Sequence, residues 1–175
     1  MNVFELQSDL AAELRNNILA HYNLYDSSGK KVAINVYEQD LPVPRSTSSG
    51  EEDEESDMLD KYTDDEPQSD PYPYVIVRVG GGRCEDPDEA EKVSVMLIIG
   101  VFDNSGDRQG HKDVLNIISK IADRFYKYHI LAKKYVFNYP LEWTLVDEDT
   151  HPYYFGGVSL TFERPTPRRE LTNLI

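Results

Sequence analysis

The apolar residues of the chain recur with two different periods, and these periods predict where helices and strands lie. A spacing of three to four residues predicts helices over residues 2–22 and 111–131. The apolar stripe of the first helix contains Leu10, Leu14, Ile18 and Tyr22. The stripe of the second helix contains Val114, Ile117, Ile118, Ile121, Phe125 and Tyr128.

Alternation of apolar and polar residues predicts five strands. They span residues 31–37, 73–79, 92–103, 135–145 and 155–164. The third strand also carries Met96, Ile98 and Phe102 on its second face, so we expect both of its faces to be covered. Pro140 lies within the fourth strand and predicts a bulge or a sheet edge at that point.

The order of these elements is α-β-β-β-α-β-β, which predicts an α/β (α+β) fold in a single domain over residues 1–175. We expect a five-stranded antiparallel or mixed sheet with the two helices on one face. The first two strands flank residues 46–70 and are expected to form a hairpin. Residues 165–175 contain two prolines and are expected to form a flexible C-terminal tail.

Much of the charge of the chain is concentrated in one segment. The chain has 18 basic and 32 acidic residues and a net charge of −14. Residues 50–66 read GEEDEESDMLDKYTDDE, and between Glu51 and Asp70 there are eleven acidic residues and one lysine. Such a segment has little to bury, so residues 46–70 are expected to be a mobile acidic loop insertion.

This acidic insertion has two candidate roles. It could line a lumen from which phosphate is repelled, or it could dock on a basic partner; the alternative is a solvated loop with no role. The candidate residues are Glu51, Glu52, Asp53, Glu54, Glu55, Asp57, Asp60, Asp64, Asp65 and Glu66. The net charge itself argues against binding nucleic acid or an anionic membrane through the average surface.

No motif in the sequence indicates catalysis, a metal or a cofactor. Cys84 is the single cysteine, and the four histidines lack the spacing of a zinc motif. The glycines after the second strand do not lead into a helix, so they do not match a phosphate-binding loop. We therefore expect a protein that is not an enzyme. The absence of a secretory signal and of a long apolar stretch predicts a soluble intracellular product.

Basic and aromatic residues suggest instead that the chain contacts other proteins. The densest basic cluster contains Arg124, Lys127, Lys133 and Lys134, and it is either a candidate interface or a solvated helix end. The last two strands carry more large rings than one helical layer can cover. The simplest cover for the remaining rings is a neighbouring subunit.

Four stretches together resemble a known family of phage proteins. They read YPYVIVRVGGG (72–82), VSVMLIIGVFD (93–103), DVLNIISKIADRFYK (113–127) and YPLEWTLVDEDTHPYYFGGVSLTFERP (139–165). In their strand–strand–helix–strand–strand order they resemble the tail terminator, tail completion or head–tail joining proteins of long-tailed, non-contractile bacteriophages of Gram-positive bacteria. The resemblance covers roughly residues 72 to 165, and the acidic insertion matches no motif of that family.

The resemblance implies a structural virion protein with no catalytic residue and no cofactor. Tail terminators form hexameric rings that cap the tail tube, stop its elongation and present a surface to the head connector. The implied partners are further copies of the chain, the tail tube protein and a head-closure or connector protein, while DNA passes through the ring without specific binding. The implied location is the tail–head junction of the virion, and the host cytoplasm during assembly.

Two other functions are kept as alternatives. One is another neck protein, a head-closure protein or a connector adaptor, which the sequence distinguishes poorly from a terminator. The other is an inhibitor that mimics DNA, which the net charge alone suggests. A DNA mimic needs acidic residues spread over a rigid surface, whereas here they are concentrated in one segment that is expected to be mobile.

Overall fold

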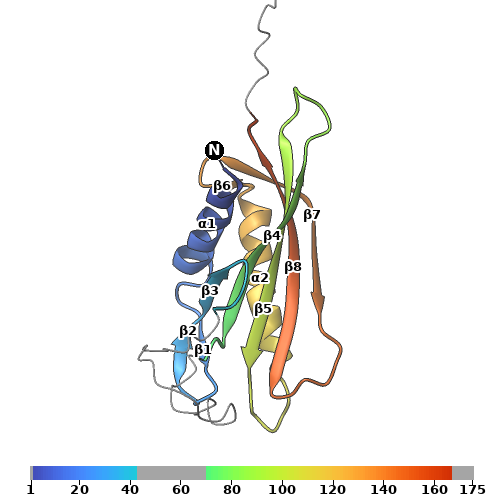
Figure 1. Ribbon diagram of the computed structural model, residues 1–175. Coiled ribbons are helices and arrows are strands. Elements are labelled where there is room, and N and C mark those ends of the chain that lie inside the picture. Colours follow the sequence, from blue (N-terminus) through green and yellow to red (C-terminus); the bar gives the residue numbers. More distant parts are fainter. Residues whose placement is uncertain (1, 43–69, 167–175) are drawn as a thin grey trace, which may run out of the picture.

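The computed structural model describes residues 2–42 and 70–166 of the chain, which form an α+β fold (Figure 1). Its first helix, α1, spans Val3–Glu13 and continues into a wider π-helical turn at Leu14–Ile18. The second helix, α2, spans His111–Lys127. Both helices start where the apolar spacing predicts, but each ends about four residues earlier than the pattern does.

The described strands form two sheets. They are β1 (Asn23–Tyr25), β2 (Lys31–Ala33), β3 (Asn35–Glu38), β4 (Tyr74–Arg83), β5 (Glu91–Phe102), β6 (Ile130–Leu131), β7 (Tyr135–Leu145) and β8 (Tyr153–Arg164). β1 and β2 pair with each other, and the other six form one mixed sheet in the order β3-β4-β5-β8-β7-β6. The main sheet therefore has six strands rather than the predicted five, because the short β6 adds to its edge.

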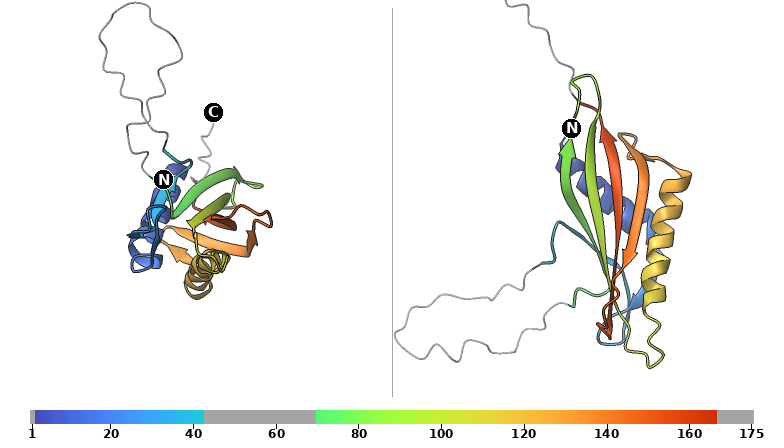
Figure 2. Two further views of the ribbon diagram at one scale, coloured as in Figure 1. Left: turned by 90° about the horizontal axis from the view of Figure 1, so that it is seen from below. Right: turned by 90° about the vertical axis from the view of Figure 1, so that its right-hand side faces the viewer.

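Both helices cover the same face of this sheet, as predicted (Figure 2). Leu6 and Leu10 of α1 and Leu14 of the π-helical turn lie in the core, and α2 contributes most of its predicted stripe. The inner face of β5 supplies residues that are fully buried: Val93, Val95, Leu97, Ile99 and Val101. The alternation in the sequence thus identifies the inner face of the central strand correctly.

β3 and β4 pair in parallel, with Val36 opposite Val75. The predicted hairpin around residues 46–70 is therefore wrong, because parallel neighbours are joined by a crossover and not by a tight turn. The chain returns from this crossover at Asp70, whose carboxylate accepts a hydrogen bond from the backbone nitrogen of Ser27 at 2.6 Å. Ser27 lies in the connection between β1 and β2, so residue 70 is fixed at that end of the molecule.

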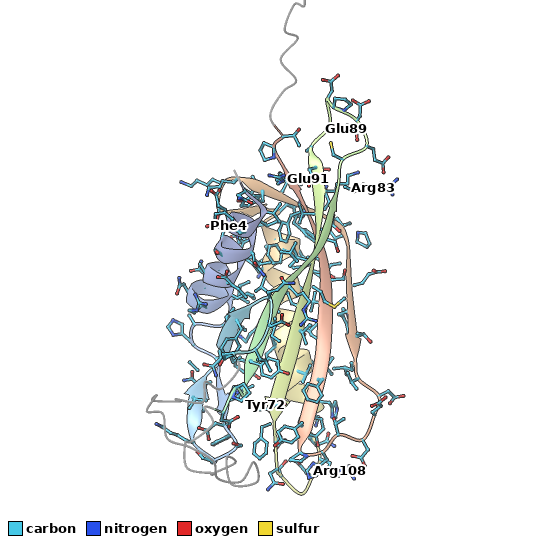
Figure 3. The ribbon with its side chains drawn as sticks, in the orientation of Figure 1. Phe4, Tyr72, Arg83, Glu89, Glu91 and Arg108 are labelled. Carbon is cyan, nitrogen blue, oxygen red and sulfur yellow. The ribbon has the colours of Figure 1, made fainter. Side chains whose placement is uncertain are left out.

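The outer face of the sheet carries its own aromatic cluster at one end. The ring of Tyr72 lies 5.1 Å from that of Tyr74 and 4.9 Å from that of Tyr153. Burial raises the pKa of Tyr72 to about 12, as expected for a phenol removed from water. Figure 3 shows Tyr72 toward the same end of the molecule as Arg108. Some of the aromatic side chains that the helices cannot cover are thus buried against one another within one chain.

The middle of this outer face is only partly covered. Met96, in the middle of β5, is 48% exposed. Ile98 and Phe102 on the same face are half-buried, so the prediction that both faces of β5 are covered holds only for part of the second face, because both helices lie on the other side of the sheet. An antiparallel pairing of this kind tolerates one solvated face.

β7 is irregular where the sequence predicts it. Its pairing with β8 shifts between Asn138 and Glu142, on either side of Pro140, so the predicted bulge is confirmed. β6 pairs only with Tyr135 and Val136. Among the described strands, the remainder of β7 has no neighbour on its outer side, which leaves an open sheet edge.

Candidate functional site

The end of α2 forms the most distinctive surface of the described chain. The helix ends at Lys127, and Tyr128 takes an extended conformation with φ −135° and ψ 103°. Tyr128 therefore leaves the buried stripe that the spacing assigned to it and is 66% exposed. Ile130 follows and is 58% exposed, so two large side chains face solvent next to a basic helix end.

These residues line a groove with a cavity volume of about 670 Å³. It is lined by Arg124, Lys127, Tyr128, His129, Ile130, Ala132 and Lys133. Three of the predicted cations, Arg124, Lys127 and Lys133, are thus brought to one place. We call this set of residues the basic groove. Its lining contains no acidic side chain, although acidic residues outnumber basic ones 32 to 18 in the whole chain.

Arg124 holds the basic groove together from within the chain. Its Nε donates to the carboxylate of Glu13 in α1 at 2.5 Å. The two terminal nitrogens donate to the backbone carbonyls of Tyr128, at 2.6 Å, and of Ile130, at 3.2 Å. Arg124 therefore joins the two helices and satisfies carbonyl groups beyond the end of α2. This guanidinium is already engaged in the fold, which sets it apart from Lys127 and Lys133.

Lys134 is also engaged within the chain. Its Nζ lies 3.2 Å from the Oδ2 of Asp9 in α1, and this hydrogen bond raises the pKa of Lys134. The pair is exposed to solvent, so it contributes little to stability. Of the four predicted cations, Lys134 does not line the basic groove.

Lys127 and Lys133 remain for contact with another molecule. Within residues 2–42 and 70–166, neither takes part in an ion pair. Lys127 projects from the last turn of α2, and Lys133 lies in the turn between β6 and β7. They are the two residues of the predicted interface whose charge the described chain does not neutralise.

The turn that carries Lys133 has an unusual backbone. Ala132 and Lys133 have φ values of 50° and 58°, and the backbone nitrogen of Lys134 donates to the carbonyl of Leu131 at 3.0 Å. Two consecutive residues with positive φ match a tight hairpin turn that favours Asn-Gly. Alanine and lysine are strained in this conformation, which costs about 1–2 kcal/mol per residue.

Replacing both turn residues with the preferred pair is expected to stabilise the protein. The variant Ala132→Asn with Lys133→Gly should raise the free energy of unfolding by about 1 kcal/mol or more, because it relieves the positive-φ strain. Urea denaturation followed by circular dichroism measures the change. The matched variant Gly29→Ala, at the positive-φ glycine of the β1–β2 turn, should change stability in the opposite direction. A loss of stability in the Asn-Gly variant would contradict this account of the turn.

Exposed rings extend from the basic groove onto β7. Tyr126 stacks on Tyr139, with ring centroids 6.2 Å apart and an interplanar angle of 16°. The ring of His129 lies 5.8 Å from Tyr139 in an edge-on contact. Tyr139 and Val136 are both exposed, so an apolar surface adjoins the cationic one. Surfaces of this composition are typical of protein–protein contacts.

Neither a protein-family model nor a curated protein sequence matches the chain. The resemblance to phage neck proteins therefore stays a prediction.

Other predicted sites lie outside the described residues or form no site within them. The ten acidic residues between 51 and 66 fall outside the described ranges, as does most of the predicted tail. In the described part of the chain, no group of three or more histidine, cysteine or acidic side chains could hold a metal ion. Cys84 is exposed at the end of β4. None of the described helices combines the length and the apolar character needed to cross a bilayer.

The sequence interpretation missed three residues of the basic groove. Tyr128 was assigned to the buried stripe, and His129 and Ile130 were placed within a longer helix. One signal in the sequence could have shown that the helix ends before them. The run YHI (128–130) lies between Lys127 and the pair Lys133 and Lys134, so a helix continued through it would place lysines and apolar residues on the same face. Helical spacing alone does not show that the helix ends first.

Proposed function

We propose that the chain is a ring-forming neck protein of a long-tailed phage, and specifically a tail terminator. The observation that carries the proposal is the uncovered apolar surface around the end of α2 and along β7, next to an open sheet edge. Tyr128, Ile130, Tyr139 and Trp143 are each more than half exposed. A monomeric protein rarely leaves such a set of large side chains in water.

The two edges of the main sheet differ, which favours a ring over a simple dimer. One edge ends in β7 and β6, with exposed rings, and the other ends in β3 and the second half of β4, with Arg78 paired to Asp40. If one edge contacts the other on a neighbouring copy, the contact is heterologous. Repeated heterologous contacts close into a ring when the rotation permits, and a tail terminator requires such a ring.

The proposal includes no catalytic step. The ring would cap the tail tube protein, stop tube elongation and bind the head-closure or connector protein. DNA would pass through the ring, and the acidic composition of the chain would keep phosphate from adhering to it. The protein would assemble in the host cytoplasm and reside at the tail–head junction of the virion.

The test is deletion of the gene from the phage or prophage that encodes it, with complementation by the wild-type gene. We expect DNA-filled heads without attached tails, tails of irregular length and no infectious particles. Electron cryomicroscopy of complemented virions should show a ring of this chain on the tail axis. Twelve copies would indicate a connector adaptor rather than a terminator. A single copy, or a position off the tail axis, would overturn the proposal.

A further inference from the structure

The basic groove has a composition that selects a particular kind of ligand. Its cationic residues Lys127 and Lys133 flank Tyr128 and Ile130, and its lining has no carboxylate. A ligand that pairs with these ammonium groups and also covers the exposed side chains must be acidic with apolar residues among the acids. An inorganic anion would leave Tyr128 and Ile130 in water.

The chain itself contains a segment of this chemistry. Residues 51–66 carry ten acidic side chains, and among these stand Met58, Leu59 and Tyr62. The acidic side chains of this segment therefore complement the lysines of the basic groove, and its apolar side chains complement Tyr128 and Ile130. We propose that the basic groove binds residues 51–66 of a second copy of this chain.

The position of the segment favours a neighbouring copy over the same chain. Asp70, where the chain returns after the segment, lies beside Ser27 near the β1–β2 connection. The basic groove lies beside β6, at the opposite end of α2 (Figure 1). α2 has 17 residues, which places the two sites about 25 Å apart along the helix axis. A segment of the same chain that reached the basic groove would have to span that distance again to return to Asp70, whereas a neighbour can present it directly.

The contact joins two different surfaces, so it is heterologous and can propagate from copy to copy. Lys133 supports the assignment independently. It occupies a positive-φ turn position that glycine fits better, and its charged side chain has no ion-pair partner among the described residues. A strained residue of this kind is expected where its side chain serves binding. The inference concerns contact between copies and does not depend on the location of the protein in a phage.

The first test measures binding of a fluorescein-labelled synthetic peptide of residues 50–66 by fluorescence anisotropy. The receptor is the full chain in which all ten acids of 51–66 are changed to their amides, so that its own segment does not compete. We expect saturable binding that weakens as salt rises. Adding Lys127→Glu and Lys133→Glu should weaken it about tenfold or more. A peptide in which Met58, Leu59 and Tyr62 are replaced by serine should bind several-fold more weakly than the native one.

The matched control reverses two exposed lysines at the far end, Lys30→Glu and Lys31→Glu, and should leave peptide binding within about twofold. Lys133→Gly gives a second control, because it should stabilise the turn and still weaken binding. An equal loss in the Lys30 and Lys31 variant, or no saturable binding, would overturn the proposal.

The second test separates contact between copies from contact within one chain. One variant carries the amide-substituted segment with an intact groove, and the other carries Lys127→Glu and Lys133→Glu with an intact segment. By analytical ultracentrifugation, each alone should be a monomer and their mixture should form a 1:1 dimer. A mixture that stays monomeric would overturn the proposal. If the peptide does not bind but a ring of this chain is still present on tails, the contact between groove and segment is overturned. The proposed function is then unaffected.

Discussion

Replacing Phe125 with alanine is expected to lower the free energy of unfolding by about 3–5 kcal/mol. The side chain is fully buried, and its ring lies 5.5 Å from that of Phe137 and 5.4 Å from that of Phe162. Through these rings α2 contacts both β7 and β8. Alanine would leave a cavity that three separate elements border, and none of them can collapse into it without disturbing the others.

The neighbouring residue supplies the matched control. Tyr126 stands one position further along α2 and is half exposed. Tyr126→Ala should cost less than about 1 kcal/mol, because it removes a surface stacking contact and opens no cavity. Urea denaturation followed by tryptophan fluorescence and circular dichroism measures both values. Similar losses for the two variants would show that α2 is not packed on the sheet through Phe125.

Arg124→Ala is expected to cost about 2–4 kcal/mol. The Arg124 and Glu13 side chains are only 20% and 15% exposed, so the substitution leaves a largely desolvated carboxylate without its partner. It also removes the donors to the carbonyls of Tyr128 and Ile130. Arg124 was predicted as an interface residue, but we expect its loss to act first on the fold.

A double-mutant cycle with Glu13→Gln measures how much of the lost free energy of unfolding comes from the interaction between Arg124 and Glu13. We expect a coupling of about 1–3 kcal/mol, and a smaller loss for Arg124→Ala when Glu13 is already neutral. Lys134→Ala is the matched control, since its pair with Asp9 is more exposed and should contribute less than about 1 kcal/mol. No coupling between Arg124 and Glu13 would mean that the ion pair is not formed in solution. For this reason the groove experiments reverse Lys127 and Lys133 and leave Arg124 intact.

The sequence predicted the parts of the fold that depend on local periodicity. The alternation in β5 and the stripe of α2 both identify residues that the structure buries, because a strand and a helix each present one face to the core. The direction of β3 against β4 could not be obtained this way. Two alternating segments show the same pattern whether they pair in parallel or antiparallel, and the 35 residues between Glu38 and Tyr74 permit either.

The candidate site was predicted only in part, for a similar reason. The basic residues near 124–134 are close in sequence, so their proximity in space was predictable. Arg124 and Glu13 are 111 positions apart, so no local sequence pattern indicates that they pair. Nor does a periodic pattern show that α2 ends at Lys127, which is the change that exposes Tyr128 and opens the basic groove.

The place of β8 in the sheet has a consequence for how the protein folds during synthesis. β8 is the last strand of the described chain, yet it lies between β5 and β7 in the middle of the main sheet. While the ribosome is still translating toward residue 164, β5 and β7 both lack the strand that pairs with them along their length, so each has a long unpaired edge. We therefore expect the fold to close only after translation of β8, with slow, non-local pairing and a dependence on chaperones until then.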